Sequence, residues 1–223
     1  VVLLIVLPVI GALAASLAMP GLAVGLMQAA RDLERGALIG LPTLFTGFRQ
    51  NTRTLLALGA LYLACTIAIL SLSALVDGGE LLQMMLSSKA ADREAIESGD
   101  FLLPALFVML LMTPVVMAYW FAPVLAAWHG LGVGKSLFFS LVACWINWRA
   151  FLVYGAGLLL CAGLLPGLVF GLLLGAFPSG ETVGVGTLLL MPLLAAVGLT
   201  VFATVYASYY ASYRDIFGPA DLA

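Results

Sequence analysis

Long apolar stretches, separated by shorter polar ones, run along the 223 residues of the chain. Each stretch is close to or longer than the ~20 residues that an α-helix needs to cross about 30 Å of hydrocarbon. The pattern predicts an all-α fold, a polytopic transmembrane helical bundle forming a single domain over residues 1–223. The five predicted spans cover residues 1–30, 54–76, 101–128, 150–177 and 184–213. We interpret residues 1–7 as the stub of a truncated first helix, which gives six spans in the full protein.

Two amphipathic segments lie between these spans, and both end in an arginine. The first has apolar residues at i, i+3, i+4 and i+7, namely Leu41, Leu44, Phe45 and Phe48, before Arg49. The second repeats the pattern over three turns before Arg149, with Leu137, Phe138, Leu141, Cys144, Trp145 and Trp148. This periodicity predicts two helices in the plane of the cytoplasmic membrane surface. Short buried helices within the bundle are the alternative.

A short motif recurs after each amphipathic segment, where the next span begins. The spacing of Asn51, Arg53 and Gly59 is repeated by Asn147, Arg149 and Gly155. Because both copies enter outward-going spans, we interpret the recurrence as a parallel internal repeat.

Composition and charge predict the class of protein and its orientation in the membrane. Hydrophobic residues make up 64% of the chain and charged residues only 9%, against about 45–50% and about 25% in soluble domains. A net charge of −2 with no basic arm gives no sign of nucleic-acid binding. Seven basic residues fall in the segments assigned to the inner side and two in the acidic segment 77–100. Because basic residues accumulate in cytoplasmic loops, we place the C-terminus in the cytoplasm.

The last span carries a stripe of tyrosines at its inner end. Tyr206, Tyr209, Tyr210 and Tyr213 fall within about a 100° arc of a helix. Phenol rings favour the headgroup level of a bilayer, so an aromatic belt is the first interpretation. A contact surface for a partner helix or a flat hydrophobic ligand is the alternative, and we assign Trp145, Trp148 and Arg149 to the same interfacial set. Beside the stripe, a ridge of small residues fit for helix contact comprises Ala203, Ala207 and Ala211.

Glycines form a regular row in the fourth span, at Gly163, Gly167, Gly171 and Gly175. A ridge without side chains lets another backbone approach closely, which favours helix association in lipid. We expect the row to pack within the chain, with a contact between subunits as the alternative.

Chemistry-bearing residues are sparse. No span carries an ionisable residue at its centre, which disfavours proton-coupled transport. His129 is the single histidine, and the three cysteines lack the spacing of a metal site or a paired disulfide. We therefore expect no catalytic residue, no metal site and no cofactor.

Four blocks of sequence carry a resemblance to a known family: "GLMQAARDLERG", "MAYWFAPVLAAWHG", "KSLFFSLVACWINWRAFLVYGAG" and "YASYRDIFG". Together they resemble an uncharacterised family of polytopic inner-membrane proteins of proteobacteria, similar at greater distance to the membrane domains of glycerophosphodiester phosphodiesterases. The resemblance implies a bacterial inner-membrane location, but it supplies no activity and no catalytic or binding residue.

The favoured function is a non-catalytic scaffold or accessory subunit. Its partners would be membrane lipids and another membrane protein or a second copy of the chain. A transporter, channel or lipid-handling protein is the alternative, and an intramembrane enzyme is the least favoured.

Overall fold

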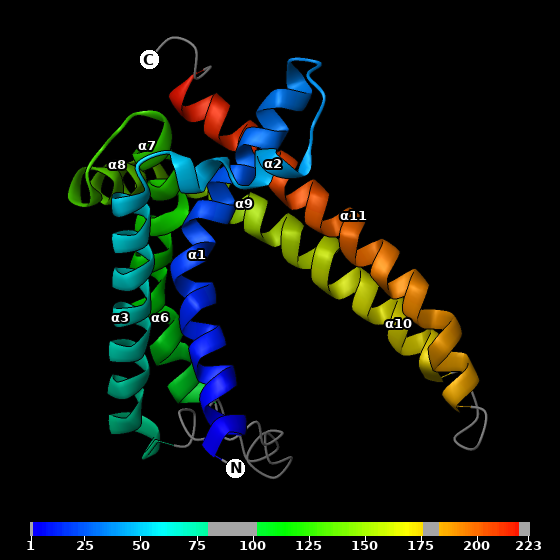
Figure 1. The fold of residues 1–223 in the computed structure, drawn as a ribbon. Helices are drawn as coiled ribbons and strands as arrows, with labels where there is room; N and C mark the ends of the chain where they lie inside the picture. The colour runs from blue at the N-terminus through cyan, green and yellow to red at the C-terminus, as the bar shows by residue number, and fades with distance from the viewer. Residues whose placement is uncertain (1, 80–101, 176–182, 219–223) are drawn as a thin grey trace. The chain divides into compact units, whose positions relative to one another are not determined.

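The computed structural model describes residues 2–79, 102–175 and 183–218, and the regular elements within these ranges are all helical (Figure 1). This confirms the predicted all-α fold. The described residues contain five spans that are long and apolar enough to cross a membrane: Leu13–Glu34, Thr52–Asp77, Leu102–Trp128, Trp148–Val169 and Met191–Phe217. Most of the predicted acidic segment 77–100 lies outside the described residues.

The helices fall into two compact units, each described by itself. One unit combines residues 1–29 with residues 38–145, and the other combines residues 30–37 with residues 146–223. The single domain expected over residues 1–223 stays a prediction.

Helix α1 (Val2–Glu34) supplies the first span and most of its length belongs to the first unit. It runs without interruption through Pro8 and Pro20. Residues 2–7 therefore belong to α1, and the expectation that they form the stub of a separate helix is wrong. A proline removes one backbone hydrogen bond, and a helix in an apolar environment tolerates this loss where neighbours satisfy the freed carbonyl.

The first predicted interfacial helix is shorter and less regular than its periodicity indicates. It consists of the four-residue helix α2 (Leu41–Leu44) and the 3₁₀ helix η1 (Thr46–Arg49), with a break at Phe45. The second is the continuous helix α8 (Val133–Ile146).

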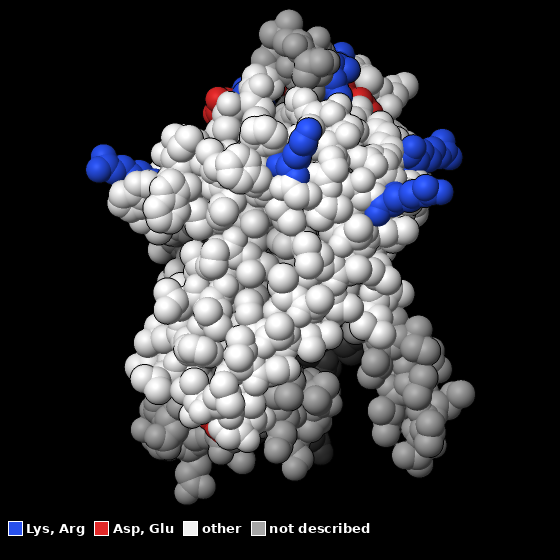
Figure 2. Space-filling model, turned by 90° about the vertical axis from the view of Figure 1, so that its left-hand side faces the viewer, with Lys and Arg blue, Asp and Glu red and all other residues white. Residues whose placement is uncertain are grey.

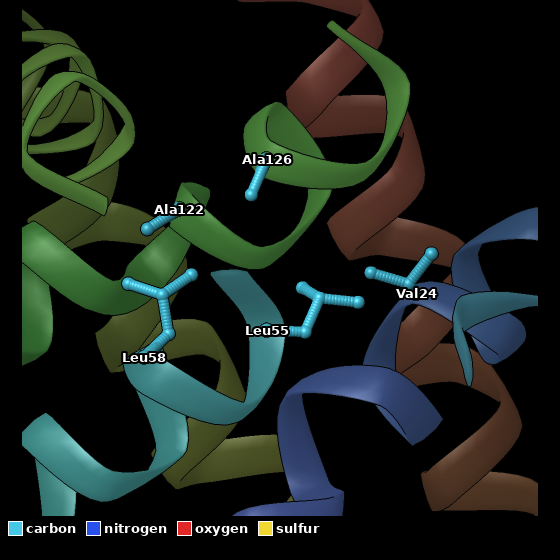
Figure 3. Close-up of a cluster of buried hydrophobic side chains, with 5 residues drawn as sticks. All are labelled: Val24, Leu55, Leu58, Ala122 and Ala126. Carbon is cyan, nitrogen blue, oxygen red and sulfur yellow. The ribbon is translucent and has the colours of Figure 1, made fainter. Parts of the chain in front are cut away.

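The core of the first unit lies where α1 meets α3 (Thr52–Asp77) and α7 (Ala122–Trp128). Five buried side chains form it, and Figure 3 shows them converging from these three helices: Val24, Leu55, Leu58, Ala122 and Ala126. Burying an aliphatic side chain contributes roughly 1.5–3 kcal/mol relative to water. The exposed surface of the spans is also apolar, so the cluster differs from that surface in being buried, and not in being more hydrophobic.

The third span is divided at Phe121 into α6 (Leu102–Trp120) and α7. Of its three prolines, Pro104 lies in the first turn of α6, where no backbone donor is lost. Pro114 lies inside α6 without a break, whereas Pro123 follows the division directly. The division of the span therefore coincides with one of its three prolines.

In the second unit, the fourth span runs through α9 (Trp148–Leu158), the π-helix η2 (Leu159–Leu164) and α10 (Leu165–Gly175). It lies alongside α11 (Val183–Phe217) in Figure 1. The Tyr154 and Ser208 hydroxyls, 2.8 Å apart, join α9 to α11.

Candidate functional site

The predicted glycine row lies in the fourth span, with Gly163 in η2 and the other three glycines in α10. A Cβ added at Gly163 would meet only Leu159 of its own helix, and one added at Gly167 or Gly171 would meet nothing within 4 Å. These two glycines line an open groove of about 400 Å³ together with Leu164, Leu168 and Leu172. In the part of the chain that the structure describes, no other helix therefore packs against the backbone of Gly167 and Gly171. The surroundings of Gly175 lie outside the description.

A different set of glycines, in the first unit, lies directly against the backbone of other segments. A Cβ at Gly25 would lie 1.9 Å from the carbonyl oxygen of Leu44, and one at Gly47 would lie 2.0 Å from that of Gly21. Gly21 and Gly25 form a small-xxx-small pair, the sequence signal that could have identified this contact. The pair lets α1 lie directly against the α2–η1 segment.

Gly59 provides a similar contact between α3 and α1. A Cβ there would meet the Cα atom of Leu17 and the carbonyl oxygen of Ser16 at 2.9 Å. Its counterpart in the predicted repeat, Gly155, has nothing within 4 Å. The two copies therefore differ in their surroundings, and the duplication stays a prediction.

Asn51 directly precedes α3 and connects it to the end of α7. Its backbone adopts the left-handed conformation (φ 48°, ψ 41°), which asparagine tolerates better than most residues. Its side-chain amide donates to the carbonyl oxygens of Ala126 at 2.9 Å and Leu131 at 3.2 Å, and its Oδ1 accepts from the Thr54 hydroxyl at 2.7 Å. Asn147 also directly precedes a span but has φ −100°.

Ser140, on α8, inserts its hydroxyl into the division between α6 and α7. The Phe121 amide donates to Ser140 Oγ at 2.9 Å, and the hydroxyl donates in turn to the carbonyl oxygen of Met117 at 2.8 Å. In an uninterrupted helix the amide of residue 121 would bond directly to that carbonyl. Ser140 thus replaces one backbone hydrogen bond of the helix by two side-chain hydrogen bonds, and these join α8 to the division between α6 and α7.

The buried face of α8 is made of small and hydroxyl side chains: Ser136, Ser140, Ala143 and Cys144. Of the leucine and aromatic arc on which the interfacial prediction was based, only Cys144 is buried. Burial raises the pKa of the Cys144 thiol to about 12. Cys65, Cys144 and Cys161 are all free cysteines, and Cys161 is exposed.

The tyrosine stripe is divided among several environments. Tyr206 lies between Phe202 and Tyr209, at centroid distances of 4.8 and 6.5 Å. Tyr213 is 1% exposed and stacks on Phe217. In the alanine ridge beside the stripe, Ala203 and Ala207 are exposed and Ala211 is half-buried.

A polar network in the second unit joins the end of α1 to α11. Tyr210 donates its hydroxyl to Glu34 Oε2 at 2.6 Å, and Arg214 forms a salt bridge with Oε1 of the same carboxylate. The two charged side chains are each more than 40% exposed, so screening keeps the contribution of the ion pair small. Sequence spacing could not show this network, because Glu34 and Arg214 lie at opposite ends of the chain.

Trp145 and Trp148, of the predicted interfacial set, are exposed, and the Arg149 guanidinium lies 5.4 Å from the centroid of the Trp148 ring. No group of three or more histidines, cysteines or carboxylates that could hold a metal occurs among the described residues. The site that emerges is therefore a set of helix contacts and interfacial side chains.

A curated relative supports the class of protein. Over 172 residues, or 74% of this chain, the sequence is 47% identical to a probable inner membrane protein of Burkholderia thailandensis. The match covers 62% of that relative, so the chain spans less than two thirds of its length. No family model matches the chain, and no solved structure matches it. A chain with five membrane-spanning candidates is thus similar to a probable inner membrane protein, whereas the likeness to phosphodiesterase membrane domains stays a prediction.

Proposed function

We propose that the chain is a non-catalytic accessory or scaffold subunit of a bacterial inner membrane, which binds a helix of another membrane protein or of a second copy along α10. The observation that carries the proposal is the open glycine face of α10. Gly167 and Gly171 meet no atom of the described chain, although they lie inside a helix that is apolar along its length.

An energetic argument connects this face to a partner. Each glycine inside a helix costs roughly 0.5–1 kcal/mol relative to alanine. Close approach of a second helix offsets that cost, because it adds dispersion contacts and Cα–H···O bonds that lipid tails do not provide as regularly. The flanking leucines Leu164, Leu168 and Leu172 would form the walls of the groove into which the partner helix fits.

Purification of the full-length protein in a mild detergent, followed by native mass spectrometry, tests the proposal. We expect a stoichiometric complex that Gly171→Leu dissociates, because the leucine fills the groove. Gly198→Leu on α11 is the matched control, since Gly198 also has nothing within 4 Å but lies outside the row. A monomer in the wild type, or a complex indifferent to Gly171→Leu, would contradict the proposal.

A transport or lipid-handling function is the second candidate, favoured by the irregular fourth span. The π-helix η2 interrupts this span, and such segments are frequent at functional sites. Solute or lipid movement by the purified monomer in proteoliposomes would support this function in place of the first.

A further inference from the structure

Helix α8 presents an aromatic face on the side opposite Ser140, the residue through which it contacts the division between α6 and α7. Phe138, Phe139 and Trp145 are 60%, 46% and 72% exposed. At 100° per residue, Lys135 lies within the same arc, near its middle. The helix therefore turns its small, hydroxyl side toward the protein and its largest apolar side chains away from it.

The connections of α8 restrict where this face can lie. Residues 129–132 separate α8 from the third span, and Asn147 alone separates it from the fourth. A helix of 14 residues is about 21 Å long, too short to cross the hydrocarbon. Because both of its ends are attached to ends of spans, α8 is held at the level where those spans leave the membrane.

The charge of the segment around α8 indicates which lipid headgroups it would bind at the membrane surface. Residues 129–149 contain Lys135 and Arg149 and no acidic residue. Figure 2 shows basic side chains projecting from a surface that is otherwise nearly uncharged. A lysine beside exposed aromatic rings can place its stem along the apolar surface and its ammonium group among lipid phosphates.

We propose that α8 lies in the headgroup boundary of the bilayer, with Phe138, Phe139 and Trp145 inserted among the acyl chains and Lys135 bound to the headgroups of anionic phospholipids. The occupant of the aromatic face is lipid, at the depth of about 5–10 Å that interfacial helices reach. This inference goes beyond the accessory-subunit proposal, because it concerns the first unit and holds whether or not α10 has a partner.

Site-specific labelling tests the insertion. In the full chain with its three cysteines replaced by alanine, Phe139→Cys is labelled with an NBD fluorophore and reconstituted in vesicles of phosphatidylcholine and phosphatidylglycerol. We expect blue-shifted emission, quenched more by lipids with a nitroxide near the headgroup than by lipids with one at the chain end. Ser136→Cys on the buried face of α8 is the matched control and should take up little label.

Two results would overturn the insertion. Quenching by aqueous iodide, with none by nitroxide lipids, would place the face in water. Quenching by neither would mean that protein covers it. If Phe139→Cys does not fold, Trp145→Phe provides the second measurement. Insertion requires that this variant lose part of the tryptophan quenching by brominated lipids, and an unchanged quenched fraction would again contradict it.

The role of Lys135 is tested by lipid retention. After reconstitution in the mixed vesicles and mild extraction, native mass spectrometry counts the bound phosphatidylglycerol and phosphatidylcholine. Lys135→Gln should lower the ratio of the two roughly fivefold, the factor that corresponds to about 1 kcal/mol per basic residue at an anionic surface. Lys135→Arg should retain the wild-type ratio, and an unchanged ratio in Lys135→Gln would refute the headgroup contact.

Discussion

Gly25 and Gly171 both lie inside apolar helices, yet only Gly25 is pressed against another part of the chain. The atom facing Gly25 is a backbone carbonyl oxygen, which cannot move away as the end of a flexible side chain can. Substituting alanine at each position therefore distinguishes the cost of disrupting a close helix contact from the intrinsic preference of a helix for alanine over glycine.

We expect Gly25→Ala to destabilise the protein by about 1–3 kcal/mol or more, because the added methyl group forces α1 away from Leu44. Gly171→Ala, the matched control, should leave the stability of the isolated chain unchanged or raise it by up to about 1 kcal/mol, since the methyl group meets no atom of the described chain. Unfolding by SDS from mixed micelles measures both. Equal stability of the two variants would show that the Gly25 contact is absent in the folded protein.

The Cys144 thiol should make the stability of the protein fall at high pH. Its pKa is raised by burial from an ordinary 9.0 to about 12, so the folded chain keeps a proton that the unfolded chain loses. Its contribution to stability is therefore constant below pH 9 and decreases as the pH rises toward 12. Cys144→Ala should reduce the decline in melting temperature over this range, whereas Cys161→Ala at an exposed position should not. Parallel pH profiles for wild type and Cys144→Ala would contradict this expectation.

At the scale of elements, the division between α6 and α7 depends on a side chain from a third helix. Pro123 predicts a weak point in the third span, but Pro114 predicts one equally and α6 passes through it. What distinguishes the division at Phe121 is the hydroxyl of Ser140, which bonds to both backbone groups that the break would leave unpaired.

Ser140→Ala should lower the free energy of unfolding by about 1–3 kcal/mol, the usual cost of leaving buried polar groups unpaired. Ser136→Ala is a matched control, because Ser136 is equally buried but donates only to carbonyls of its own turn, those of Gly132 and Val133. It should cost less than about 1 kcal/mol. Similar losses in the two variants, measured by thermal unfolding in detergent, would mean that the Phe121 amide closes directly onto Met117.

Sequence reasoning located the spans because an apolar stretch long enough to cross a bilayer has few other interpretations. It could not choose the contact faces, because in an apolar chain both sides of a helix are hydrophobic. On α8 the leucine and aromatic arc predicted an interfacial helix, but it did not indicate that Ser136 and Ser140 are the residues that pack against the protein. Among the glycines, the regular spacing that includes Gly167 and Gly171 is the stronger sequence pattern, but the close backbone contacts are at the single pair Gly21 and Gly25.

At the scale of the whole molecule, each described span connects to the next through a short segment or through residues outside the description. The segments that the sequence assigns to the inner side contain the α2–η1 and α8 helices as well as Glu34 and Arg214. The contact between Glu34 and Arg214 requires that the end of α1 and the end of α11 face the same aqueous compartment. The distribution of seven basic residues against two predicts that this compartment is the cytoplasm.

Reporter fusions test this orientation in cells. A fluorescent protein that matures only in the cytoplasm, fused after Ala223, should be bright, and alkaline phosphatase at the same position should be inactive. Fusions in the acidic segment, after Ser98, should give the reverse pair of results, because one span separates this segment from each inner segment that flanks it. The paired fusions control for expression. Active phosphatase at the C-terminus would reverse the assignment and would place Lys135 and the exposed face of α8 at the outer leaflet.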